Sequence, residues 1–98
     1  MVISTPQITI DTETQVVLCG KKILQFTDQE FKLLYLLMKH AGKPVPREKI
    51  LNYIWHSSTG LKTRIVDVYI GYLRKKLENN CDPKIIKSVR GLGYMITD

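Results

Sequence analysis

The sequence predicts a single α+β domain in which a short antiparallel sheet precedes three helices and a C-terminal β-hairpin. Three observations indicate this order. Polar and apolar residues alternate near the N-terminus, apolar residues recur at helical spacing in three central segments, and a glycine-rich tip separates two apolar segments near the C-terminus. The chain has 98 residues, enough for one core and too few for two. We therefore assign residues 1–98 to one domain.

The first predicted element is a small antiparallel sheet over residues 7–26. Residues 7–10 alternate polar and apolar, which is the period of a strand, and residues 15–19 are mostly β-branched and apolar. A turn at Gly20 would lead into a further strand over residues 22–26. We expect one face of this sheet to be buried.

The first helix is predicted to begin after Thr27 and to run to about His40. Thr27 and Glu30 have the spacing of a capping box, in which each side chain binds the backbone amide of the other residue. Apolar residues follow on nearly all sides of the segment, so this helix is expected to be central and buried. Gly42 and Pro44 end it.

Two more helices complete the predicted three-helix core of residues 27–79. The second runs from about Pro46, which suits a first helical position, to Trp55. The third spans residues 62–79. At about 100° per residue, its apolar side consists of Val66, Tyr69, Ile70, Leu73 and Leu77. Its opposite side consists of Arg64, Asp67, Val68, Gly71, Lys75 and Glu78.

The last predicted element is a hairpin over residues 85–97. Its strands, at residues 85–89 and 94–97, flank the sequence Arg90-Gly91-Leu92-Gly93. Arg90 would therefore lie near the tip of the hairpin, where the two glycines leave little bulk around it.

Positive charge is concentrated in the second part of the chain. The net charge is +6, and lysines and acidic residues cancel in the first 42 residues, so the excess belongs to residues 43–98. A basic surface favours DNA, RNA or anionic lipid as a partner. Sequence-specific RNA-binding modules usually expose aromatic side chains on a sheet, whereas here Tyr69 and Tyr94 are expected to point inward and only Tyr72 outward. Duplex DNA is the favoured partner.

The second and third helices, with the turn-prone residues 56–62 between them, form a predicted helix-turn-helix with a long turn. An α-helix fits the major groove of B-DNA, where Arg64, Arg74 and Lys75 can pair with phosphates or guanine. Arg90 suits the minor groove, where the potential is most negative. Taken singly, these features also fit a solvated basic helix face and an ordinary turn arginine. The combination of helix and hairpin favours DNA.

Four motifs follow one another along the chain: Thr27-x-x-Glu30-Phe31-x-Leu33-Leu34, then Arg47-Glu48 ahead of Leu51 and Trp55, then Arg64-x-Val66-Asp67-Val68-x-Ile70-x-x-Leu73-Arg74-x-Lys76-Leu77, and finally Val89-Arg90-Gly91-x-Gly93-Tyr94. In this order they resemble the winged-helix effector domain of OmpR/PhoB-type response regulators. The resemblance covers residues 7–97. It implies a four-stranded N-terminal sheet, three helices, a C-terminal wing and sequence-specific binding to promoter DNA.

The resemblance also implies a role for individual residues. In the recognition helix, residues 62–78, the positions that face DNA are Arg64, Asp67, Val68, Gly71, Tyr72 and Arg74. The positions that contact phosphates are Arg47, Trp55 and Ser88, and Arg90 is the wing residue that enters the minor groove. We add Lys62, Thr63, Lys75 and Lys87 to the predicted DNA-binding set. The loop that can contact RNA polymerase consists of His56, Ser57, Ser58, Thr59, Gly60 and Leu61.

Such domains usually follow a phosphoacceptor receiver domain, which a sensor kinase controls, and they bind direct repeats as head-to-tail dimers. No receiver sequence occurs in residues 1–98, which leaves open whether Met1 is the native first residue. Off DNA we expect a monomer. Two departures from the family pattern stand out: Gly71 and Tyr72 replace basic residues in the recognition helix, and Pro46 replaces a serine cap of the second helix.

Several classes of function are not indicated. We expect no membrane span, no signal peptide and a cytoplasmic location, with Cys19 and Cys81 as inert thiols. Histidine and cysteine lack metal-ligand spacing, and no pattern of nucleophile and base occurs, so we expect no metal, no cofactor and no enzymatic activity. The main alternative is a winged-helix protein-interaction module that docks through Leu92 and residues 56–62.

Overall fold

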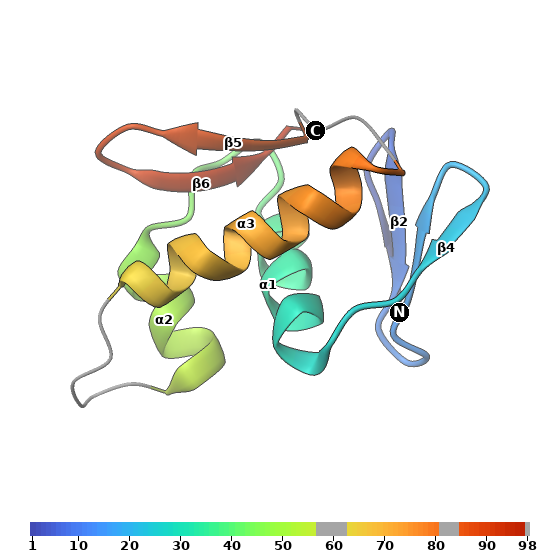
Figure 1. Ribbon diagram of the computed structural model, residues 1–98, viewed down its shortest axis with the longest axis horizontal. Coiled ribbons are helices and arrows are strands. Elements are labelled where there is room, and N and C mark those ends of the chain that lie inside the picture. The colour runs from blue at the N-terminus through green and yellow to red at the C-terminus, as the bar shows by residue number, and fades with distance from the viewer. Residues whose placement is uncertain (57–62, 81–84, 98) are drawn as a thin grey trace.

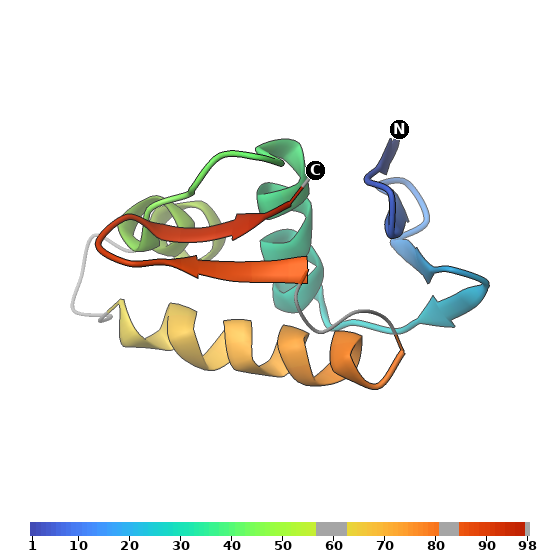
Figure 2. The same ribbon diagram turned by 90° about the horizontal axis from the view of Figure 1, so that it is seen from above.

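The structure, a computed structural model, describes residues 1–56, 63–80 and 85–97 of the chain (Figure 1). In these residues a four-stranded antiparallel sheet precedes three helices and a two-stranded hairpin. The predicted α+β class and the predicted order of elements are therefore confirmed. The N-terminal sheet lies at the opposite end of the molecule from helix α2 (Arg47–Trp55) and from the tip of the hairpin (Figures 1 and 2).

The N-terminal sheet has the strand order β1-β2-β3-β4, in which every neighbouring pair is antiparallel. Its strands are β1 (Val2–Ser4), β2 (Ile8–Asp11), β3 (Val16–Cys19) and β4 (Lys22–Leu24). Its inner face contributes Ile8, Ile10, Val17, Cys19 and Leu24 to the core. The prediction of a sheet over residues 7–26 missed β1, which has only three residues with mixed burial and is ordered by pairing with β2.

Cys19, at the end of β3, is buried and disulfide-bonded. The expectation of an inert thiol at this position was therefore wrong, and Cys81 lies outside the described residues. Spacing along the sequence does not reveal such a bond, because a disulfide depends on which segments approach each other within about 7 Å in the fold.

Helix α1 (Asp28–Lys39) occupies the centre of the domain and contacts α2, α3 (Arg64–Glu78), β1 and β6 (Gly93–Ile96) (Figure 1). The predicted capping box is confirmed: the Glu30 amide donates to Thr27 Oγ1 at 3.3 Å, and the Thr27 amide donates to Glu30 Oε1 at 2.9 Å. The helix ends at Lys39. The chain then turns at Gly42, which has a φ of 84° and whose amide donates to the carbonyl of Ile96.

Helices α2 and α3 (Arg64–Glu78) pack against α1 and against each other. Pro46 was predicted to be the first helical residue of α2. It is instead the N-cap of this helix, because its ψ of 146° is extended. It makes no side-chain cap hydrogen bond. The predicted apolar side of α3 is confirmed, since Val66, Ile70, Leu73 and Leu77 are at most 1% exposed. No helix in the described part of the chain has the length and apolarity needed to cross a membrane.

The hairpin, or wing, consists of β5 (Ile86–Val89) and β6 (Gly93–Ile96), and it runs beside α3 (Figures 1 and 2). Its β6 strand also bridges to Val45, the residue two positions before α2. Gly93 is required at this crossing. Its φ is 137°, and a Cβ atom would lie 2.0 Å from the Val45 carbonyl oxygen.

Candidate nucleic-acid interface

One side of α3 projects away from the core. The exposed residues along it are Arg64, Val68, Gly71, Tyr72 and Lys75. Two of them are large and apolar or aromatic: Val68 is 45% exposed and Tyr72 is 50% exposed. A Cβ atom added at Gly71 would meet nothing within 4 Å, so this position is open. Among the three tyrosines considered from the sequence, Tyr72 alone is exposed, as expected.

A groove separates the tip of the wing from the beginnings of α2 and α3. Its volume is about 650 Å³, and it is lined by residues 46–48, Thr63 and residues 88–93. Arg47 and Arg90 bring positive charge to it, and the N-terminal ends of two helices add the positive ends of their dipoles. The wing also exposes Lys87 and, at its tip, Leu92. A polyanion suits this groove better than a small apolar ligand.

Asp67 lies at the junction of α2, α3 and the wing. Its Oδ1 atom accepts a hydrogen bond from Arg47 Nε at 2.8 Å and another from the Tyr94 hydroxyl. The hydrogen bonds to Tyr94 and Asp67 raise the pKa of Arg47. Burial, followed by the bond to Asp67, raises the pKa of Tyr94 above its ordinary value. The predicted DNA-facing Asp67 thus has two partners within the protein.

Arg74 makes a second connection between α3 and the wing. Its Nη2 atom donates to the Ile86 carbonyl at 3.2 Å and to Ser88 Oγ at 2.9 Å. The guanidinium groups of Arg47 and Arg74 each lie 5.6 Å from the centre of the Tyr94 ring. Four residues of the predicted DNA-binding set (Arg47, Asp67, Arg74 and Ser88) are therefore linked to one another through the wing.

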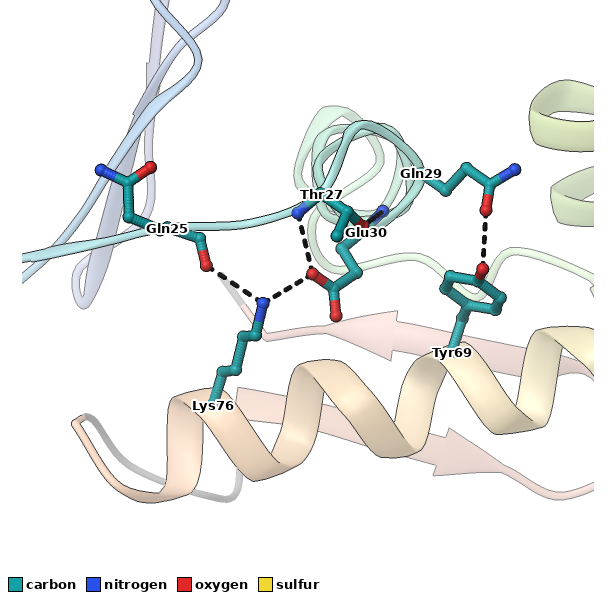
Figure 3. Close-up of polar contacts among 6 residues, drawn as sticks. All are labelled: Gln25, Thr27, Gln29, Glu30, Tyr69 and Lys76. Carbon is teal, nitrogen blue, oxygen red and sulfur yellow. Dashed lines mark hydrogen bonds and ion pairs between the residues drawn. The ribbon is translucent and has the colours of Figure 1, made fainter.

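Trp55, which the resemblance makes a phosphate contact, packs against α3. Its ring lies 5.1 Å from that of Tyr69, and Tyr69 lies 5.3 Å from Tyr72, both in edge-on geometry. The Tyr69 hydroxyl donates to Gln29 Oε1 at 2.6 Å (Figure 3). The expected inward orientation of Tyr69 is confirmed.

A partly buried ion pair ties α3 to the start of α1 (Figure 3). Lys76 Nζ lies 2.7 Å from Glu30 Oε1 and donates to the Gln25 carbonyl at 3.1 Å. Burial alone would raise the pKa of Glu30, but the hydrogen bonds from Lys76 and from the Thr27 amide lower it below its ordinary value. We assigned Lys76 no role from the sequence. The sequence signal that could have indicated this contact is the capping-box residue Glu30, because its carboxylate can accept a second hydrogen bond beside that from the Thr27 amide.

The remaining predicted site residues divide in two. Thr63 lines the groove, and His56 ends α2 in a left-handed conformation with a φ of 48°. The rest of the predicted polymerase-contacting loop, residues 57–61, lies outside the described residues, and so does Lys62. No cluster of histidine, cysteine or acidic side chains that could hold a metal occurs in the described ranges 1–56, 63–80 and 85–97.

Comparison with known proteins identifies the family. The family model described as "Transcriptional regulatory protein, C terminal" matches residues 20–96. The chain belongs to this family. Its members are regulatory domains rather than enzymes. The response regulator ArlR of Staphylococcus aureus is 40% identical to this effector domain over 95 residues, which are 97% of the chain and 43% of ArlR. The chain thus spans less than half the length of this curated relative.

Solved structures confirm the OmpR/PhoB-type winged-helix fold. The RstA DNA-binding domain of Klebsiella pneumoniae, solved in complex with the RstA box, is 34% identical with a TM-score of 0.86, and the match covers 98% of this chain and 96% of that one. The response regulator DrrB of Thermotoga maritima, an OmpR/PhoB homologue, is 33% identical with a TM-score of 0.85, over 99% of this chain and 44% of DrrB. The four-stranded sheet and wing implied by the resemblance are both present.

Proposed function

We propose that this domain binds duplex DNA sequence-specifically and forms the DNA-binding part of a response regulator that controls transcription. The observation that carries the proposal is the juxtaposition of an exposed face of α3 with an arginine-tipped wing, whose tip lines one groove together with the beginnings of α2 and α3. These two probes suit the major and the minor groove. The similarity to RstA, whose domain was solved with its DNA box, supports the same function.

In this proposal the recognition helix, residues 62–78, enters the major groove. Arg64, Val68, Tyr72 and Lys75 are the exposed side chains that would meet DNA there. Arg90 enters the minor groove, and Arg47, Trp55 and Ser88 contact phosphates. The remaining predicted DNA-binding residues are Lys62, Thr63, Arg74 and Lys87. Gly71 leaves an open position on the helix, so Gly71→Arg is expected to change the preferred sequence.

The first experiment is selection from a random duplex pool at about physiological salt, followed by sequencing of the bound fraction. We expect enrichment of two direct repeats about one helical turn apart. With about five phosphates neutralised, the logarithm of the affinity should fall with the logarithm of the salt concentration at a slope of about −4 to −5. Binding without enrichment would contradict base readout, and a salt-insensitive interaction would contradict the phosphate contacts.

Point variants separate DNA binding from a protein-interaction function, which the 59% exposure of Leu92 at the wing tip also fits. Arg64→Ala and Arg90→Ala should each weaken DNA binding. The matched control is Lys21→Ala, because Lys21 is an exposed cation in the turn between β3 and β4, and the N-terminal sheet lies at the opposite end of the molecule from the tip of the wing (Figure 1). A domain that bound only a protein partner would tolerate loss of both arginines.

The partners of the longer protein belong to the same proposal. Because the matched relatives are response regulators more than twice as long, we infer a receiver domain and a sensor kinase for the complete protein, and a cytoplasmic location with access to promoter DNA. Head-to-tail dimers on direct repeats and a contact of residues 56–61 with RNA polymerase follow from the family resemblance. The polymerase contact is tested by transcription in vitro from the selected repeats. The wild-type protein is compared with variants that carry alanine substitutions in residues 56–61.

A further inference from the structure

Asp67 joins three structural elements through one carboxylate oxygen. Arg47 comes from α2, Tyr94 from β6 of the wing, and Asp67 itself from the first two turns of α3. Both hydrogen bonds fall on Oδ1 and come from within the protein, and the bond from Arg47 is charge-assisted, so together they fix the direction of the carboxylate toward α2 and the wing. Its geometry suits a connection within the protein.

Tyr94 is the point where the wing is attached to the rest of the domain. Its backbone exchanges two hydrogen bonds with Val45, at 2.8 and 3.1 Å, just before α2. Its ring is 6% exposed and lies near the guanidinium groups of Arg47 and Arg74. The backbone bonds hold β6 in place. The hydroxyl bond to Asp67 adds a contact to α3, which opposes rotation of the wing about the backbone crossing.

Arg74 supplies a second contact between α3 and the wing, at a different strand. It holds β5 through Ile86 and Ser88, whereas Asp67 holds β6. Asp67 and Arg74 are seven residues apart, which is about two helical turns, so they lie on the same side of α3 about 10 Å apart along its axis. Two attachments at this separation restrain both the distance and the tilt of the wing.

We propose that Asp67 is a positioning residue, which holds the wing at a fixed orientation to α3 so that Arg90 and the exposed face of α3 engage DNA at the same time. It does not read a base. The proposal rests on the DNA binding proposed above, and it assigns specificity to a contact within the protein.

One substitution distinguishes a positioning role from base readout and from charge repulsion, through the direction in which specific and non-specific affinity change. Asp67→Asn removes a negative charge from the DNA-binding side and weakens both contacts of this residue, because a neutral amide oxygen binds Arg47 and Tyr94 less strongly than a carboxylate does. Affinity for non-specific duplex should therefore stay the same or rise. Specific affinity should fall, because a wing with a looser orientation no longer places Arg90 at its site. A merely unfolded fraction would lower both affinities together.

A double-mutant cycle measures the coupling on the selected duplex. The ratio of specific to non-specific affinity should fall about tenfold in Asp67→Asn, the scale of one charge-assisted hydrogen bond. Arg90→Ala should weaken specific binding about tenfold in the wild-type background and less than about threefold in the Asp67→Asn background. Equal effects of Arg90→Ala in the two backgrounds, or a changed base preference under the middle of α3 alone, would overturn the proposal.

Tyr94→Phe is the second variant, since it keeps the buried ring and removes the hydroxyl together with its bonds to Asp67 and Arg47. It should show the same reduced effect of Arg90→Ala. Two matched controls leave the junction intact: Glu13→Gln neutralises an exposed carboxylate in the turn between β2 and β3, and Tyr53→Phe removes the hydroxyl of an exposed tyrosine on α2. Neither control should change the specificity ratio.

The orientation of the wing can also be measured without DNA. Residual dipolar couplings of backbone amides report the angle between β5–β6 and α3, and Asp67→Asn and Tyr94→Phe should each change it or increase wing mobility. An unchanged wing in both variants would refute the positioning role. If the wing changes in both variants but the wild-type domain selects no DNA sequence, the positioning role stands and only the proposed function is refuted.

Discussion

Replacing Glu30 by glutamine tests the partly buried ion pair that joins α1 to the recognition helix. Glutamine keeps an oxygen for the Thr27 amide and for Lys76, so the variant removes the charge and preserves the capping geometry. The Glu30 side chain is only 6% exposed, which favours a large effect, but Lys76 is 39% exposed and can turn to water. Removing one partner of a fully buried pair costs about 3–5 kcal/mol, and we expect about 1–2 kcal/mol here after allowing for solvent.

The assay is urea and thermal unfolding followed by circular dichroism. A loss of this size corresponds to a decrease in Tm of about 4–16 °C for a domain of this length. Glu13→Gln, at a carboxylate with an 83% exposed side chain, is the control and should change the free energy of unfolding by less than about 0.5 kcal/mol. Lys76→Met completes a double-mutant cycle.

The pH dependence gives the same contact a second signature. The pKa of Glu30 is lower in the folded state than its ordinary value of 4.5. Its contribution to stability is therefore complete above the unfolded pKa and is lost as the pH falls through the lower folded pKa. The wild type and Glu30→Gln should converge in stability below that range and diverge above it. A difference of constant size from pH 7 to pH 2, or none at pH 7, would refute the reasoning.

Three further substitutions have distinct expected outcomes. Gly93→Ala should unfold the domain or reduce its stability by more than about 3 kcal/mol, because the new Cβ atom would strike the Val45 carbonyl; a folded variant with the wild-type free energy of unfolding in urea would contradict this. Gly71→Ala should raise the free energy of unfolding by about 0.5–1 kcal/mol, since alanine favours a helix and the Cβ meets open space; urea unfolding measures the gain. Tyr69→Phe should cost about 1 kcal/mol by losing the bond to Gln29, and a neutral result would show that water replaces it.

Much of the fold could be predicted from the sequence because it depends on local patterns. The capping box at Thr27 and Glu30 places the start of α1 through contacts three residues apart. The apolar side of α3 follows from helical spacing, and it is buried as expected. The exposed tip with Arg90 follows from the glycines on the wing. For the same reason, the exposed side chains of α3 could be proposed as a DNA-binding face before any tertiary contact was known.

The structure decided the features that depend on segments distant in the sequence. Strand β1 forms because β2 offers it a partner, and the disulfide at Cys19 requires an approach that spacing cannot show. Asp67 was predicted to face DNA from its place on the helix, but its partners Arg47 and Tyr94 lie 20 and 27 residues away. Periodicity tells which side of an element a residue occupies. Only the packing of the elements determines which donors reach a carboxylate there, and these donors separate a residue that can meet DNA from one that positions the wing.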